Sequence, residues 1–232
     1  MTTVAIHQPN YLPWVGFFAK ALSSDVFVIL DNVQYERRGY TNRVRIKMTQ
    51  GAHWLTQPVI TRGRYYQEVR EVEFACDDWP KKHLRALQQS YGHAPHFGAY
   101  FGPLAELLGE PGSSALECNE RLIRWIFGVL AMPTRVERAS DLVQDEPDAN
   151  RRLIRLVQAA QGNTYFSGAG GFAYQDLHAF AQAGIRVERS CAEFPEYPQL
   201  WGPFVSGLSI LDLLFNCGPA SRAYLEKSRR AV

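Results

Sequence analysis

The sequence predicts an α/β protein whose sheet is mostly parallel and begins with a βαβ unit. The continuous apolar run at residues 26–30 is typical of a strand buried on both faces, as the strands of a parallel sheet are. A short apolar strand at residues 3–6, a loop and a helix at residues 16–23 precede this run and complete the βαβ unit. A β-hairpin insertion and a helical middle segment follow it.

The composition is that of a soluble globular chain without a strong bias of charge. Of its 232 residues, 46% are hydrophobic and 21% charged, which excludes disorder, collagen and coiled coil. We expect one domain over residues 1–232, with a helical subregion at about 80–161. Since 25 basic residues stand against 23 acidic ones, a small ligand is favoured over a nucleic-acid polymer. Aromatic residues, 12% of the chain, suffice for both a core and a ligand pocket.

Targeting and metal-binding signals are missing from the sequence. The first ten residues lack the basic and apolar regions of a signal peptide, and no apolar run reaches the roughly 18 residues of a membrane span. The cysteines form no C-x-x-C pair and stand at Cys76, Cys118, Cys191 and Cys217. We therefore expect a cytoplasmic protein with reduced cysteines, no metal and no membrane partner.

Residues 42–60 predict the inserted hairpin. Apolar residues alternate there with cations, so we expect Arg45 and Lys47 to lie on a solvated strand face. Gly51 supplies the turn. Residues 69–74 alternate again and predict another strand.

The spacing of apolar residues predicts the remaining elements. A capping box at residues 114–117 begins one helix, and Gly162 provides the C-cap of another. Strands are expected at residues 164–166 and from residue 185. The predicted helices are residues 82–91, the segment from the capping box to Pro133, and residues 148–161, 174–183 and 208–216.

A first polar cluster follows the first predicted strand. In open α/β sheets, ligands bind beyond the carboxyl ends of the strands, and two prolines stiffen this loop. Packing of the loop aromatics into the core is the structural alternative. The cluster comprises His7, Gln8, Asn10, Tyr11 and Trp14.

Asp31 ends the second predicted strand, and Gln34 follows it. Carboxyl ends of neighbouring parallel strands meet, so we expect Asp31 near His7, where it would orient the imidazole and raise its basicity. The structural alternative is an aspartate that caps a turn.

Cations and aromatics interleave at residues 36–47, which include Tyr40, Asn42 and Arg43. Arginine suits phosphate, while a nucleic-acid site and a solvated face are the alternatives. In a nearly neutral chain, one such patch fits a nucleotide or a sugar phosphate better than a polymer.

Two further patterns lie in the last third. Ser167, Gly168 and Gly170 stand between a strand and a helix, where backbone N–H groups can face an anion. An ordinary turn between a strand and a helix is the structural alternative. Asp212 and Asn216 share a face of the last helix, and a buried Asp212 requires a partner such as an arginine or a backbone amide.

Taken together, these motifs resemble the WbqC-like protein family. The resemblance implies a bacterial protein of O-antigen or related biosynthetic clusters, in a family suggested to include glycine transferases that act on sugars. It covers nearly the whole chain, in blocks at residues 7–18, 31–35, 42–43, 54–55, 140–142, 165–168, 197–199 and 208–216.

The function expected from this resemblance is transfer of a small acyl group, such as glycyl, to an amino group of a sugar or related metabolite. His7 would be the general base or a transition-state donor, Asp31 would orient it or deprotonate the amine, and Arg43 would hold a phosphate or carboxylate. The remaining expected substrate contacts are Gln8, Asn10, Tyr11, Trp14, Gln34, Tyr40, Asn42, Ser167, Gly168, Gly170, Tyr197 and Gln199.

Two alternatives use the same loops. The opening strand, loop, helix and strand are also similar in topology to nucleotidyltransferases with an HxGH loop, although residues 13–17 carry no histidine. That similarity implies activation of a carboxylate by a nucleotide with Mg²⁺. The acyl transferase expected above would instead use an acyl-thioester donor. A non-catalytic protein that binds a sugar nucleotide is the other alternative. In each case the expected partner is a phosphorylated or sugar-like small molecule.

Overall fold

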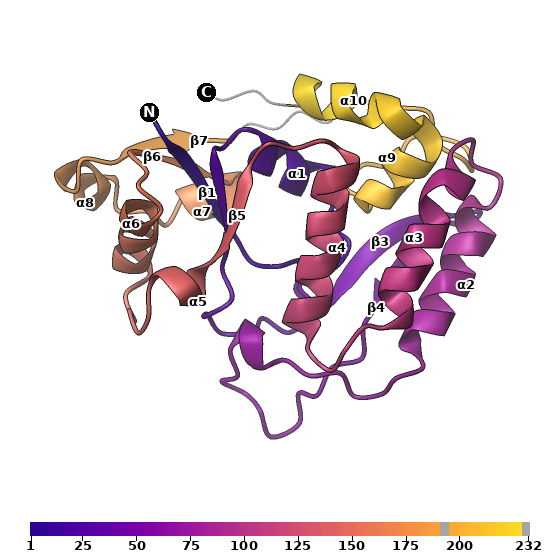
Figure 1. Cartoon of the computed structure of the whole chain (residues 1–232), viewed down its shortest axis with the longest axis horizontal. Coiled ribbons are helices and arrows are strands. Elements are labelled where there is room, and N and C mark those ends of the chain that lie inside the picture. The colour runs from indigo at the N-terminus through magenta and orange to yellow at the C-terminus, as the bar shows by residue number, and fades with distance from the viewer. Residues whose placement is uncertain (191–194, 229–232) are drawn as a thin grey trace.

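A computed structural model describes residues 1–190 and 195–228 and confirms the predicted α/β fold (Figure 1). Parallel strands form a sheet in the order β5-β2-β1-β6-β7, and an antiparallel hairpin stands apart from it. The sheet strands are β1 (Thr3–His7), β2 (Val26–Ile29), β5 (Arg135–Arg138), β6 (Thr164–Ser167) and β7 (Arg186–Arg189). The hairpin strands are β3 (Arg43–Met48) and β4 (Gly51–Thr56).

Helices cover both faces of the sheet, which is what strands buried on both sides require (Figure 1). Helices α1, α4, α9 and α10 lie on one face, and α5, α6 and α8 lie on the other. The helices are α1 (Val15–Leu22), α2 (Trp79–Tyr91), α3 (Phe97–Gly109), α4 (Ala115–Val129), α5 (Ala139–Leu142), α6 (Ala149–Ala159), α7 (Ala169–Phe172), α8 (Leu177–Gln182), α9 (Ile210–Cys217) and α10 (Ser221–Lys227), with 3-10 turns η1 (Val69–Glu71) and η2 (Gly218–Ala220).

Successive residues of the central strands enter two separate cores. Ala5 and Phe27 pack beneath α1 and α4, whereas Val4 and Val28 pack with Phe180 of α8 on the other face. All five side chains are fully buried, and each large one contributes about 1.5–3 kcal/mol by leaving water. Because both faces of β1 are apolar, polar side chains are confined to its ends.

Several predicted elements differ from the structure. Residues 69–74 do not form a strand, because Glu68 and Glu71 close a capping box around the turn η1. The helix predicted at residues 174–183 begins at Leu177, where Asp176 accepts hydrogen bonds from two backbone N–H groups. The sequence did not predict α3, which contains a proline, or β5, a polar strand at the sheet edge.

The prediction that Lys47 lies on a solvated strand face is wrong. It is 1% exposed, whereas its neighbour Arg45 is partly exposed. The segment around residues 199–209 folds against β3 and covers Lys47. Alternation along β3 indicated the face correctly, but a distant part of the chain buries it.

Gly162 allows α6 and β1 to approach each other closely. It is not the predicted C-cap of α6, which is Ala160, and the left-handed residue that follows the helix is Gln161 with φ 57°. A Cβ atom on Gly162 would lie 2.3 Å from Val4 Cγ2 and 3.1 Å from Val157 Cγ1. The position therefore requires glycine for space.

We predict that Gly162→Ala lowers the free energy of unfolding by about 1–3 kcal/mol, because its methyl group overpacks the contact with Val4. Urea denaturation measures the change. Gly102→Ala, in open space on α3, is the control and should be neutral or stabilising by up to about 1 kcal/mol. Equal stabilities of the two variants would contradict this packing.

Candidate functional site

The carboxyl ends of β1 and β6 form the candidate site. The chain leaves β1 through α1 on one face of the sheet, and it leaves β6 towards α8 on the opposite face. In open α/β sheets, ligands bind where neighbouring connections diverge in this way. Four residues expected from sequence are brought together here: His7, Gln8, Ser167 and Gly168.

His7 is held as a neutral imidazole whose Nε2 has no hydrogen-bond partner among the residues that the structure describes. Its Nδ1 lies 3.0 Å from the Gln8 carbonyl oxygen, which can only accept, so Nδ1 carries the proton. Nε2 then presents a lone pair. Burial, and next the charge of Lys20, lower the pKa of His7 to about 4. At neutral pH, His7 is therefore unprotonated, and its lowered pKa makes it a weaker base than an ordinary histidine.

Lys20 lies beside this histidine and was missed by the sequence analysis. It is 6% exposed, its Nζ donates to the Ile6 carbonyl oxygen at 2.7 Å, and burial lowers its pKa to about 7. Its Nζ is 3.8 Å from the point that a Cβ on Gly168 would occupy. A signal was available, since Lys20 is the one charged residue of the wholly buried helix α1.

The turn after β6 is ordered by side-chain hydrogen bonds. Ser167 is fully buried, its Oγ donates to the Gly168 carbonyl oxygen at 3.2 Å, and it accepts from Gln175 Nε2 at 2.6 Å. Gly170 lies exposed on the short helix α7. Anion binding by this turn stays a prediction.

The loop after β1 is clamped from α4 and from the segment before the hairpin. Asn119 Nδ2 donates to the carbonyl oxygens of Pro9 at 3.1 Å and Thr41 at 2.6 Å. Gln57 Nε2 donates to Asn119 Oδ1 at 3.3 Å, and Thr41 Oγ1 donates to Gln8 Oε1 at 3.4 Å. Asn119 was also missed, although a polar residue within the apolar stripe of α4 was visible in the sequence.

Tyr11 belongs to the core, so the prediction that it stacks on a ligand is wrong. It is fully buried, its hydroxyl lies 2.9 Å from His83 Nδ1, and its ring meets Trp79 edge-on. Asn10 is 5% exposed. Trp14 is partly exposed at the start of α1, and its ligand contact stays a prediction.

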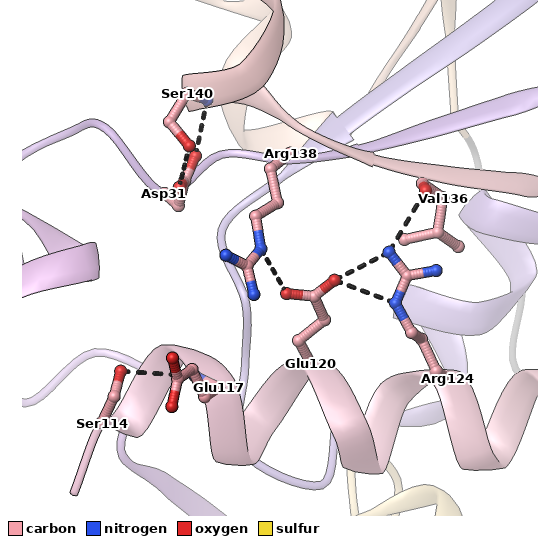
Figure 2. Close-up of polar contacts among 8 residues, drawn as sticks. All are labelled: Asp31, Ser114, Glu117, Glu120, Arg124, Val136, Arg138 and Ser140. Atoms are coloured by element: carbon pink, nitrogen blue, oxygen red, sulfur yellow. Dashed lines mark hydrogen bonds and ion pairs between the residues drawn. The ribbon is translucent and has the colours of Figure 1, made fainter.

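Asp31 does not pair with His7, which corrects the expected His–Asp arrangement. Figure 2 shows its carboxylate facing Ser140, which donates its backbone N–H at 2.9 Å and its hydroxyl at 2.6 Å. Ser140 follows β5, the other neighbour of β2. Asp31 thus anchors the start of α5, as in the turn-capping alternative.

An ion-pair network joins α4 to the end of β5 (Figure 2). The buried Glu120 carboxylate lies 2.6 Å from Arg138 Nε and 2.7 Å from one terminal nitrogen of Arg124. Beside this network lies a hollow of about 320 Å³ that is lined by both acidic and basic side chains. Its lining residues are Gly112, Glu117, Glu120, Arg121, Arg124 and Arg138. These charges largely compensate one another.

The hairpin carries a separate arginine–aromatic group. The Arg43 guanidinium lies 4.3 Å from the Trp54 ring centre, and Tyr40, 45% exposed, lies 5.8 Å from the same ring. Arg43 also donates to the Arg38 carbonyl oxygen. Asn42 Nδ2 donates to the carbonyl oxygen of Gln57 at 2.8 Å and so serves the hairpin itself. An anion-binding role for Arg43 stays a prediction.

Gln34 lies near this hairpin group in sequence but bonds to a different segment. Its Nε2 donates to the Tyr65 carbonyl oxygen at 3.0 Å, and its backbone forms an isolated bridge with Glu68. Substrate contact by Gln34 stays a prediction.

Gln199 takes part in a second polar cluster, inside the fold. Lys47 Nζ donates to Gln199 Oε1 at 3.1 Å, to the Gly202 carbonyl oxygen at 3.2 Å and to that of Pro203 at 2.6 Å. Gln199 also accepts from the backbone of Val205. These contacts give Gln199 a structural role, and substrate contact by it stays a prediction.

Asp212 lies in the same cluster, and its partner is neither an arginine nor a backbone amide. Tyr91 donates its hydroxyl to Asp212 Oδ2 at 2.9 Å. Burial raises the pKa of Asp212 to about 6, against the effects of hydrogen bonds from Tyr91 and Tyr197 and the charge of Lys47. Tyr197 is 8% exposed, so its predicted substrate contact has little surface available.

No group of three metal-ligating side chains occurs among residues 1–190 and 195–228. Within these residues, no helix is both long and apolar enough to cross a membrane. Cys118 is buried, and burial raises its pKa to about 12. Cys191 lies outside the described residues.

Comparison with known proteins decides the family. The model of the WbqC-like protein family matches residues 8–224. The chain belongs to this family. This WbqC-like chain is also 38% identical over 232 residues to the "Uncharacterized protein Rv1507c" of Mycobacterium tuberculosis (strain ATCC 25618 / H37Rv), a match that covers 99% of the chain and 100% of the relative. No solved structure matches it.

We predict that Asp31→Asn destabilises the protein by about 1.5–3 kcal/mol, because charged hydrogen bonds from Ser140 are lost. The pKa of His7, followed by NMR, should stay unchanged. The control is Asp141→Asn, at an exposed residue of α5, the helix that also carries Ser140. We expect it to change the free energy of unfolding by no more than about 0.5 kcal/mol. A shifted His7 titration in Asp31→Asn would reinstate the His–Asp pair.

Stability should depend on pH through His7. Its pKa is about 4 in the folded protein against 6.5 when unfolded, so only the unfolded chain binds a proton between these values. Stability therefore falls as pH drops through this window, by about 1–2 kcal/mol between pH 7 and pH 5 from His7 alone. His83 acts in the same direction and Asp212 in the opposite one. Urea unfolding of His7→Asn at pH 7 and pH 5 should show a smaller loss of unfolding free energy than the parent, because the contribution of His7 is absent.

The exposed His93 provides the control for that measurement. His93→Asn should retain the parental difference in stability between pH 7 and pH 5. If His7→Asn behaves in the same way, His7 is not held neutral by the fold.

Proposed function

We propose that this chain transfers a small acyl or aminoacyl group, glycyl among them, to an amino group of a sugar or related metabolite. The observation that carries the proposal is the state of His7: a neutral imidazole whose Nε2 lone pair stands at the carboxyl ends of β1 and β6. An amine that attacks an acyl carbon must lose a proton, and the lone pair on His7 Nε2 can take it, as a weaker base than an ordinary histidine unless a bound anion offsets the charge of Lys20.

In the proposed step, the acceptor nitrogen forms a bond to the acyl carbon while the bond from that carbon to the leaving group breaks. The proton of the attacking amine passes to His7 Nε2 and from there to the leaving group. The donor is an activated acyl compound such as a thioester. Asp31 takes no part, because Ser140 occupies its carboxylate.

The rigid surroundings of His7 support a role in positioning a substrate. Asn119 Nδ2 donates to the Pro9 carbonyl oxygen, and Lys20 Nζ donates to that of Ile6. The Phe17 ring meets the His7 ring edge-on, with 5.0 Å between their centres. A base held in place avoids the entropic cost of orienting it in each turnover. Of the aromatics expected to contact a sugar, Trp14 and Tyr40 retain exposed surface.

The sheet order favours a second candidate, a nucleotide-dependent ligase or nucleotidyltransferase. Counted within the parallel sheet, β5-β2-β1-β6-β7 is the order 3-2-1-4-5, which is typical of nucleotide-binding α/β folds. Such an enzyme would join a carboxylate to a nucleotide with release of pyrophosphate, before transfer to the amine. The chemistry at His7 in the transfer step would be the same.

We predict that His7→Ala lowers the rate of amide formation about 10²–10⁴-fold, the usual contribution of a general base. The assay offers amino-sugar nucleotides with either a glycyl thioester or glycine, ATP and Mg²⁺, and detects the amide by mass spectrometry. His93→Ala, at an exposed histidine, should keep the parental rate. Parental activity of His7→Ala would refute the proposal.

The donors separate the candidates. Product from the glycyl thioester without ATP supports acyl transfer, and product that requires ATP and releases pyrophosphate supports the nucleotide-dependent enzyme. Binding of a sugar nucleotide without any product would favour the non-catalytic alternative and count against both enzymes.

A further inference from the structure

We infer that Lys20 and Gly168 form an anion-binding subsite at the β1–β6 edge, which takes a phosphoryl or carboxylate group of the ligand next to His7. The inference deepens the proposed function and rests on it for the identity of the ligand. Its test measures binding, so that the two can fail separately.

The first observation is the poor compensation of a buried amine. An ammonium group has three donors, and within residues 1–190 and 195–228 Lys20 Nζ has one acceptor, the Ile6 carbonyl oxygen at 2.7 Å. Among the described residues, no carboxylate forms an ion pair with it. Since the residue is 6% exposed, solvent compensates it little. A buried cation in this condition is stabilised by an anion brought in from outside.

Lys47 shows how the same fold treats a purely structural lysine. It is 1% exposed, yet its Nζ has three oxygen acceptors between 2.6 and 3.2 Å, and Asp212 stands close enough to act on its charge. The contrast between one acceptor and three indicates that Lys20 is left with capacity for a ligand.

The second observation is the glycine opposite the amine. Gly168 has φ −71°, which any residue adopts, so its backbone does not require glycine. A Cβ there would stand 3.8 Å from Lys20 Nζ. The missing side chain therefore leaves room on that side of the amine, and the strand ends around it are those to which ligands of such sheets bind.

The third observation is the placement of the charge next to the proposed base. Lys20 acts on His7 strongly enough to lower its pKa, which places the two groups in one electrostatic environment. Burial lowers the pKa of Lys20 itself to about 7. The titratable group that faces it from β1 is His7, and the turn after β6 contributes the uncharged Ser167 and Gly168. An anion bound here would keep the amine protonated.

One ammonium group can bind one oxyanion group of a ligand. Two parts of the proposed substrates carry such a group. One is a phosphoryl group of a nucleotide or sugar phosphate, and the other is the carboxylate of an amino acid. Both present oxygens that accept from an ammonium. Inorganic phosphate and glycine represent the two sources.

The experiment follows the ¹⁵Nζ resonances of the five lysines of the full-length protein by NMR, while phosphate or glycine is added. We expect a saturable rise in the pKa of Lys20 with at least one of the two, and none for the exposed Lys81. Phosphate alone, glycine alone or both identify the source. No response of Lys20 to either would overturn the inference.

Variants test the same subsite by calorimetry. Lys20→Met should weaken binding of the active probe roughly tenfold or more, and Lys81→Met, with the same change of charge, should not. Gly168→Ala should fold, because 3.8 Å is an ordinary contact, and should also weaken binding. It remains informative if Lys20→Met is unstable. Parental affinity in Gly168→Ala and in any folded Lys20→Met would overturn the inference.

Failure of the subsite differs from failure of the proposed function. If Lys20→Met loses binding while His7→Ala keeps the parental rate of amide formation, the subsite stands and acyl transfer by His7 does not. If His7→Ala loses turnover while Lys20→Met keeps both affinity and KM, the reverse holds.

Discussion

Asn119 holds together the segments that surround His7. Its buried side-chain amide donates to the Pro9 carbonyl in the loop after β1 and to the Thr41 carbonyl before the hairpin. A buried carbonyl left without a donor costs about 1–3 kcal/mol, so one side chain on α4 sets the path of two distant segments. The buried position of Tyr11, the approach of the hairpin and the rigidity of the candidate site all follow from that path.

The titratable groups of the molecule divide by how completely the fold supplies them with polar partners. Ser140 satisfies Asp31, three oxygens satisfy Lys47, and two arginines satisfy Glu120. These groups stabilise the positions of helices and strands. His7 and Lys20 are different, because in the described part of the chain each is engaged by one backbone carbonyl and the charge of Lys20 acts on His7. Incomplete compensation at a strand end is typical of a group that meets a ligand.

The sequence sufficed to predict the parallel sheet and the position of His7 and of Ser167 at the ends of strands. Both predictions depend on local pattern, since a continuous apolar run indicates a buried strand and parallel strands bring their carboxyl ends to one edge. It could not predict that Asp31 would turn away from His7. That outcome depends on β5, a polar edge strand without an apolar run, which brings Ser140 to the other side of β2.

The sequence by itself determined the family, the α/β class and the edge of the sheet at which the polar loops gather. Tertiary structure decided which of those polar residues are free to act. Internal hydrogen bonds engage the side chains of Tyr11, Asn42 and Gln199. Lys20, by contrast, lies in an otherwise apolar helix and close enough to His7 for its charge to act on the histidine. The physical reason is that a polar group's availability depends on which partners the rest of the chain brings within hydrogen-bonding distance. Those partners come from segments far apart in the sequence, and only the tertiary fold brings them together.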